Sequence, residues 1–383
     1  MNKRYALVLA LLAVIAGGAA LFMHQREESA QPALAAQLGQ PLFKDLKASE
    51  MASIVIRAPK ATLTLAKKGG LWTLPERKGF PVDLNKVREL VLQAIELKIG
   101  RVEDITEQDR ARLGLLDPGK GAQPSDGSAT ALTFKAADGR LLAQLLIGAK
   151  YFRAPPAADA EHVPADGRFV MLPEHAQQVF VVSDPLRLVS AASADWVAKD
   201  GIAVERMKSI EVKPAEGGGY KIERSAESAD WKLVPAKGAG RLDPAKANAA
   251  AYSLGKLDID DVAAEDKSGN SDFDRPNVIT ATTFDGLTYV LHLGRLENDR
   301  YRLRVEVEGR PKRELELRKD EKPEAKAARE KSFAAEVKRL NERVEREQAL
   351  KDYVLVVAKR KLADLLKNRS DLLQQAKKPE KKP

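Results

Sequence analysis

One pattern of residues occurs twice in this chain, first from about residue 51 and again from about residue 207. Trp72-Thr73-Leu74 returns as Trp231-Lys232-Leu233, while Asp83 and Leu97 return as Asp243 and Leu257, each 160 positions later. A long-period repeat of this kind predicts two copies of one structural unit. The matching positions are apolar, aromatic or helix-capping, so the repeat predicts a fold without indicating a ligand or a reaction.

The offset between the copies changes after the first helix, which marks loops of different length. Val179-Phe180-Val181-Val182 finds its match only at Val354-Leu355-Val356-Val357. We therefore expect a first repeat, a second repeat with a long insertion, and a basic disordered tail. These segments span residues 43–198, 199–374 (insertion 310–350) and 375–383.

Each copy predicts an α+β domain. In the first copy, β-branched and apolar stretches at 51–57, 61–67 and 70–74 predict a three-stranded antiparallel meander. Asp83 then precedes apolar residues at the helical period, and in the second copy Asp243 is followed by proline, a favoured first helical residue. An Asp-Gly turn between two apolar runs follows in each copy. The pattern predicts a mostly antiparallel sheet with one main helix on a face, closed by a short apolar helix after the last strand.

The N-terminus carries the pattern of a membrane anchor. Residues 5–23 form an uncharged apolar run, close to the ~20 residues that cross a bilayer. Basic residues precede it, so the positive-inside rule places residues 1–4 in the cytoplasm and the rest of the chain outside. A cleaved signal peptide is the alternative, because Ala33-Leu34-Ala35 resembles a cleavage site, although signal peptides usually have an apolar core of ~7–15 residues. We expect an uncleaved single-pass anchor followed by a linker at 24–42.

The composition does not favour a nucleic-acid, nucleotide or metal site. The net charge is +9, but basic residues alternate with acidic ones and the excess collects in the C-terminal tail. Gly114 to Lys120 fits the start of a P-loop, yet Gly121 stands where that loop needs Ser or Thr. The chain has no cysteine, and its four histidines lack metal-ligand spacing. We therefore expect no cofactor, no metal and no catalytic residues.

The insertion is almost entirely charged residues and alanine between 319 and 350, with one narrow apolar stripe. Such a stripe is too narrow for a large core but suits a single helical neighbour, as in a coiled coil. Two interpretations stay open: a helix that lies on its own domain, or an arm that docks a partner subunit. The stripe consists of Phe333, Val337, Leu340 and Val344.

Several motifs make the first copy resemble a known family. The Trp-x-Leu meander and the Asp-capped helix are followed by Leu113-Gly114-Leu115-Leu116-Asp117-Pro118 and by a hairpin that ends at Leu146-Ile147-Gly148. This combination is similar to the bacterial domain-of-unknown-function 4340 family. The second copy matches more weakly, because Phe273-Asp274-Arg275-Pro276 stands in place of the first run.

Members of that family are typically single-pass membrane proteins encoded beside an ABC-type transporter and a gliding-motility-type auxiliary subunit. The resemblance therefore implies a non-enzymatic accessory protein of an envelope transport complex, anchored in the bacterial inner membrane with most of its chain in the periplasm. The implied partners are the transporter permease and the auxiliary subunit. A module that binds an envelope glycan is the alternative, and it would need exposed aromatic side chains such as Trp72, Trp196 or Trp231.

Overall fold

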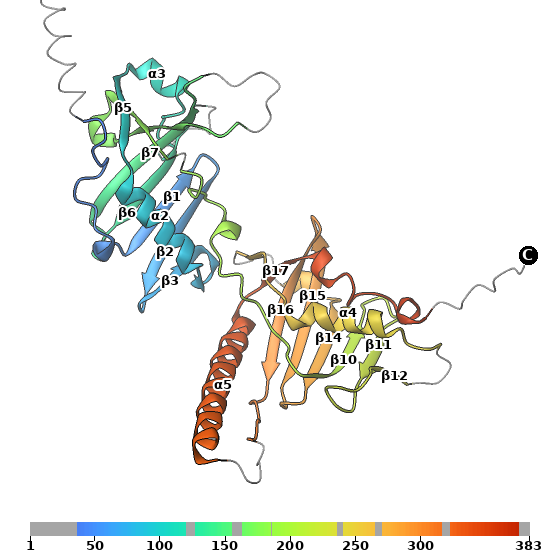
Figure 1. The fold of residues 1–383 in the computed structure, drawn as a ribbon. Helices are drawn as coiled ribbons and strands as arrows, with labels where there is room; N and C mark the ends of the chain where they lie inside the picture. The colour runs from blue at the N-terminus through green and yellow to red at the C-terminus, as the bar shows by residue number, and fades with distance from the viewer. Residues whose placement is uncertain are drawn as a thin grey trace, which may run out of the picture. The chain divides into compact units, whose positions relative to one another are not determined.

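The computed structural model describes seven stretches of the chain (Figure 1). The N-terminal segments expected at 1–4 and 5–23, the linker up to residue 36 and the tail at 375–383 lie outside them. Within the described stretches, no helix combines the length and apolar character needed to cross a membrane. The stretches are residues 37–119, 127–154, 163–184, 186–235, 240–264, 270–315 and 322–374.

The chain divides into two compact units. The first is Met1–Thr73 with Leu84–Ala192, and the second is Leu74–Asp83 with Ser193–Pro383. This division differs from the expected boundary at residues 198 and 199. Residues 74–83, which precede the first main helix, and residues 193–198, which end the first repeat, belong with the second unit.

Hydrogen bonds explain why residues 74–83 and 193–198 group together. Val82 forms a β-bridge with Val197, and Arg77 Nη2 donates to Ser193 Oγ at 2.8 Å. Ser193 Oγ in turn donates to Asp261 Oδ2 at 2.9 Å. These bonds connect both stretches to the second sheet.

The first sheet has nine strands in the order β4-β3-β2-β1-β6-β7-β8-β9-β5. The meander expected from the sequence forms β1 to β3, and the hairpin about the Asp-Gly turn forms β6 and β7. The bounds are β1 (Ser53–Ala58), β2 (Ala61–Lys68), β3 (Leu71–Leu74), β4 (Phe80–Pro81), β5 (Ile99–Asp104), β6 (Thr130–Lys135), β7 (Leu141–Tyr151), β8 (Gly167–Met171) and β9 (Gln178–Val182).

The second sheet has eight strands in the order β12-β11-β10-β14-β15-β16-β17-β13. Its strands also pair antiparallel. The bounds are β10 (Met207–Lys213), β11 (Tyr220–Glu223), β12 (Lys232–Val234), β13 (Asp261–Val262), β14 (Asn277–Thr283), β15 (Thr288–Glu297), β16 (Arg300–Glu308) and β17 (Leu355–Ala358).

Apart from β4, the two sheets follow the same strand order. The register also agrees: Val181 pairs with Arg101 at the β5–β9 edge, and Val356 pairs with Asp261 at the β13–β17 edge. Two mostly antiparallel sheets with few helices confirm the expected α+β class.

The main helix of each copy begins directly after the expected aspartate. α2 (Leu84–Glu96) follows Asp83. α4 (Pro244–Gly255) is capped by Asp243, whose Oδ1 accepts the Ala245 N–H at 2.9 Å. Both helices bury one apolar face, as their 3.6-residue period predicts. The buried residues are Val87, Leu90, Val91 and Ala94 in α2, and Ala247, Ala250, Ala251 and Leu254 in α4.

The remaining short elements are one α-helix and several 3₁₀ turns. The apolar helix expected after the last strand of each copy is replaced by such turns. They are α3 (Glu107–Arg112), η1 (Ala48–Glu50), η2 (Pro75–Arg77), η3 (Pro173–His175), η4 (Ser193–Asp195), η5 (Asn270–Phe273), η6 (Leu350–Asp352), η7 (Lys359–Leu362) and η8 (Arg369–Leu372).

Part of the stretch expected as a linker belongs to the fold of the first unit. Leu42 is buried, and its backbone N–H donates to the Leu97 carbonyl at 2.7 Å. In the second copy, Ile202 donates to Leu257 in the same way at 3.2 Å. A peptide group so held belongs to the fold, so the compact part starts before residue 43.

In each sheet, one glycine lets a loop backbone pack directly against a strand. A Cβ on Gly148 of β7 would lie 2.3 Å from the Leu113 carbonyl oxygen, and one on Gly294 of β15 would lie 2.7 Å from the Asp272 oxygen. Contacts this short are sterically forbidden, so both positions require glycine. The turn around Phe273 thus covers the second sheet where the run from Leu113 covers the first.

The insertion contains α5 (Pro323–Ala349), a helix of 27 residues. It contacts β16 and η6 of its own unit (Figure 1). The coiled-coil partner suggested by the narrow stripe is therefore replaced, among the described residues, by a strand.

Candidate functional site

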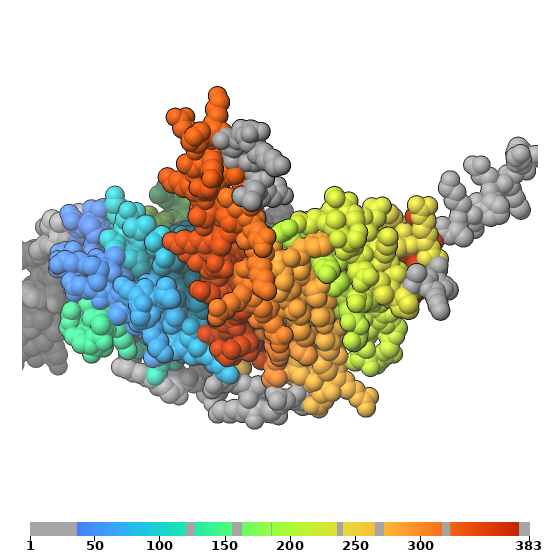
Figure 2. Space-filling model, turned by 90° about the horizontal axis from the view of Figure 1, so that it is seen from below, coloured from blue at the N-terminus to red at the C-terminus, as the bar shows by residue number. Residues whose placement is uncertain are grey.

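The four stripe residues lie on α5, but they have different surroundings. Leu340 and Val344 in the second half are 5% and 3% exposed. Phe333 and Val337, which lie earlier on the helix, are only partly buried. Figure 2 shows the first half of α5, in orange, projecting from the surface of its unit. The stripe is therefore covered at one end and accessible at the other.

A buried carboxylate fixes the second half of α5 to the sheet. Glu347 is 2% exposed, and it accepts hydrogen bonds from the Ala203 N–H at 2.8 Å and the Tyr289 hydroxyl at 2.7 Å. Arg343 lies 3.7 Å away, one turn earlier on α5. Burial raises the pKa of Glu347 because desolvation disfavours its charged form, although these three groups act in the opposite direction. Burial likewise raises the pKa of Tyr289.

A second ionic cluster connects the first half of α5 to the Asp-Gly turn of the second copy. Asp285 in that turn is 2% exposed and accepts from Arg206 and from Arg313, the latter with Nη2 at 3.2 Å from Oδ2. Arg313 also pairs with Glu336 of α5. The cluster holds the start of the insertion near the projecting helix.

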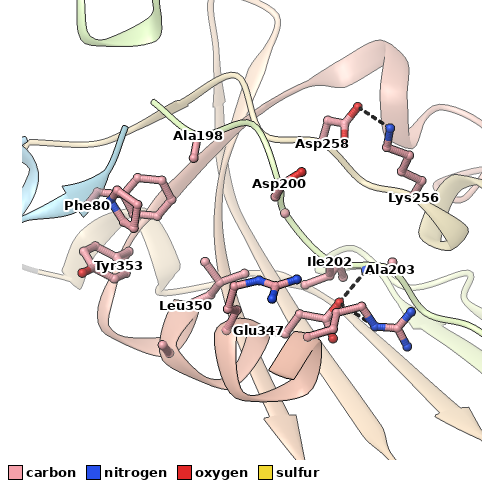
Figure 3. A pocket seen from close by; sticks show the side chains of 15 residues that line it. Phe80, Ala198, Asp200, Ile202, Ala203, Lys256, Asp258, Glu347, Leu350 and Tyr353 are labelled. Atoms are coloured by element: carbon pink, nitrogen blue, oxygen red, sulfur yellow. Dashed lines mark hydrogen bonds and ion pairs between the residues drawn. The ribbon is translucent and has the colours of Figure 1, made fainter. Parts of the chain in front are cut away.

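A cavity of about 350 Å³ lies beside the C-terminal end of α5 in the second unit (Figure 3). Phe80 and Tyr353 form one wall, with their rings edge-to-face and the centroids 4.9 Å apart. Phe80 and Ile202 are each 3% exposed and Leu350 is 6% exposed, so the floor is apolar. Four separate stretches supply the lining: Phe80 and Pro81, 198–203, Lys256 with Asp258, and 343–353.

The charged groups of this cavity are only partly paired. Lys256 Nζ lies 3.9 Å from Asp258 Oδ2, and Arg343 is paired with Glu347. Asp200 and Arg346 are both exposed at the opening. Neither forms a hydrogen bond or an ion pair with the part of the chain described. The cavity therefore combines an apolar floor with one acceptor and one donor that remain available.

The tryptophans considered for glycan binding are mostly covered. Trp196 is 1% exposed and Trp231 is 8% exposed. The Arg224 guanidinium lies 4.7 Å from the centre of the Trp231 ring. Trp72 is half-buried in β3. Two of the three rings are thus in the core or covered by a neighbouring side chain.

The other sequence motifs do not assemble a chemical site. In the P-loop-like run, Leu115 is completely buried and Leu116 bridges to Ser128, while Lys120 lies outside the described stretches. Over the described residues, no group of three His, Cys, Asp or Glu side chains could hold a metal ion.

Sequence reasoning did not identify the cavity. The spacing of its charged residues in the sequence matches no motif, and its four stretches come together only in the folded structure. A local signal could have drawn attention only to the aromatic residues Phe80 and Tyr353.

Comparison with known proteins places the chain in one group. The model of the family described as Domain of unknown function (DUF4340) matches residues 72–276, more than half of the 383 residues. No curated protein and no solved structure matches the chain. The matched segment begins at Trp72 and ends in the turn that covers β15.

Proposed function

This chain belongs to the DUF4340 family, and from that premise we propose that it is a membrane-anchored, non-enzymatic accessory protein of a bacterial ABC-type envelope transport complex. Residues 5–23 serve as an uncleaved anchor in the inner membrane, with residues 1–4 in the cytoplasm. Two tandem copies of one α+β domain, 43–198 and 199–374, lie in the periplasm. The transporter permease and the auxiliary subunit are the proposed partners.

The observation that carries this proposal is the uneven attachment of α5. Its second half is fixed by buried Leu340 and Val344 and by the hydrogen bonds to Glu347. The part of α5 before Leu340 presents Phe333 and Val337, which are only partly covered. A rigid base with an accessible apolar end suits protein recognition, because a few apolar anchors carry most of the energy of an interface.

The proposed docking surface consists of Phe333 and Val337. They lie four positions apart, so they share one face of the helix. Exposed charged residues flank them on α5, among them Lys338 and Glu342, which form an ion pair at 3.9 Å. This apolar centre with a polar rim is the usual anatomy of a protein interface. The glycan-binding alternative has weaker support, because Trp196 and Trp231 are covered.

Co-purification tests the docking surface. The full-length chain, tagged and expressed in its own bacterium, is recovered from solubilised membranes, and we expect the permease and the auxiliary subunit to come with it. Phe333→Ala combined with Val337→Ala should lower their recovery at least about tenfold, since loss of two anchors costs more than about 1.4 kcal/mol. The unfolding temperature should change little.

Lys331→Ala combined with Arg339→Ala is the matched control. Both side chains are exposed on α5, and helical spacing places them away from the stripe. This control should leave recovery unchanged. Recovery of the wild-type chain alone, together with retention on a peptidoglycan resin, would instead favour the glycan-binding function. Undiminished recovery with the Phe333 and Val337 variant would reject the docking surface.

A further inference from the structure

The cavity beside the end of α5 has the features of a binding site for a small amphipathic ligand. Its volume of about 350 Å³ is at the lower end of the roughly 300–1,000 Å³ found for ligand sites. Its floor is apolar and aromatic, formed by Phe80, Ile202 and Leu350 together with half-buried Tyr353. A cavity of this size takes one large side chain rather than an extended ligand.

The charges at the opening define the polar part of the ligand. Arg346 can donate five N–H hydrogen bonds and donates none to the described chain. Lys256 is exposed and only loosely paired, at 3.9 Å from Asp258. A carboxylate matches the fork of an arginine in a bidentate geometry. Asp200, also unpaired, accepts a hydrogen bond and repels a second negative charge, so the site disfavours a dianion such as phosphate.

The ligand that fits this site therefore carries a large apolar group, a carboxylate and an N–H close to one another. The C-terminal residue of a peptide satisfies this condition when its side chain is large and apolar. We propose that this cavity binds the C-terminal residue of a peptide chain. The side chain fills the aromatic floor, the terminal carboxylate binds Arg346, and the amide N–H donates to Asp200.

This proposal is independent of the docking surface on α5. The cavity is lined by Arg343 and later residues of the helix, whereas Phe333 and Val337 lie at least one full turn earlier. Loss of one site should leave the other intact, so the two tests fail separately.

Ligand-observed NMR on the full-length chain in lipid nanodiscs tests the proposal. The probes are N-acetyl-L-phenylalanine, its uncharged C-terminal amide, and the peptide acetyl-Ala-Ala-Phe with a free carboxylate. We expect the two acids to bind about tenfold tighter than the amide, as one charge-assisted pair provides. If the single residue binds and the peptide does not, the ligand is a free acylated amino acid and the peptide-terminus proposal is overturned.

Three variants locate the site. Arg346→Ala should abolish the preference for the acid, while Arg339→Ala, which removes an exposed arginine elsewhere on α5, should preserve it. Ala349→Phe should fill the cavity and weaken all three probes, with an unchanged unfolding temperature because Ala349 is exposed. Equal binding of acid and amide, an unchanged preference in the Arg346 variant, or no binding to the wild-type chain would each overturn the proposal.

Discussion

Replacing Gly148 by alanine tests whether the loop packed on β7 stabilises the first unit. The new Cβ would lie 2.3 Å from the Leu113 carbonyl oxygen, whereas ordinary contacts begin at 3.4 Å, so the loop must move by about 1 Å. The same oxygen accepts the Ala149 N–H at 2.8 Å, and this movement weakens that bond as well. Overpacking costs about 1–3 kcal/mol and the hydrogen bond about 1 kcal/mol. Alanine loses less conformational freedom than glycine when the chain folds, which stabilises the fold by about 0.5–1 kcal/mol and offsets only part of this loss.

We expect Gly148→Ala to destabilise the first unit by about 2–3 kcal/mol, which lowers its unfolding temperature by roughly 5–12 °C. Calorimetry of the full-length chain measures this, with the transitions of the two units analysed separately because a chain of two units need not unfold in one step. Gly294→Ala should instead lower the unfolding temperature of the second unit.

Gly255→Ala is the control for this experiment. Gly255 ends α4, and a Cβ there would meet nothing within 4 Å, so alanine should be neutral or stabilise by up to about 1 kcal/mol. A change below about 0.5 kcal/mol for Gly148→Ala would refute the steric argument, since it would mean that the loop yields without cost.

The same structure makes two further predictions about α5. Leu340→Ala should lower the free energy of unfolding by about 2–5 kcal/mol, because removal of a buried leucine side chain leaves a cavity. Phe333→Ala should lower it by less than about 1 kcal/mol. Equal losses in urea denaturation would contradict the division of the helix into a fixed and an accessible part. Since burial raises the pKa of Glu347, its contribution to stability is fully present below the unfolded-state pKa and is lost as pH rises through the folded-state pKa. Wild-type stability should therefore fall relative to Glu347→Gln as the pH rises above the ordinary glutamate pKa of about 4.3, and a pH-independent difference would count against this origin.

Local sequence signals were sufficient for the meander, the hairpins and the main helices, but not for the segment after the last strand of each copy. The three-stranded meander, the Asp-Gly hairpins and the helix after Asp243 each depend on residues close together in the chain, such as a cap followed by proline. The repeat added a long-range relation, because two copies of one pattern predict the same strand order. The unit boundary was not predictable, since it depends on bonds such as Ser193 to Asp261 between distant residues.

Side-chain environments were harder to predict than elements. The spacing of Phe333, Val337, Leu340 and Val344 places them on one helix face, but which of them are covered depends on how α5 packs against its own unit. Similarly, the sequence predicts that Glu347 is one more surface charge in a highly charged helix, yet it is buried against Tyr289. The cavity could not be predicted at all, because its lining is assembled from four separate stretches.

The assignment of Leu74–Asp83 to the second unit has a consequence for how the protein can be made. Synthesis proceeds from the N-terminus, and domains generally fold as units as they emerge. This short stretch is synthesised early, but Tyr353, which packs against Phe80, is synthesised much later. The second unit therefore closes only after residue 353 has left the ribosome. A gene divided between the two sequence repeats would yield two fragments, each lacking part of one cooperative unit.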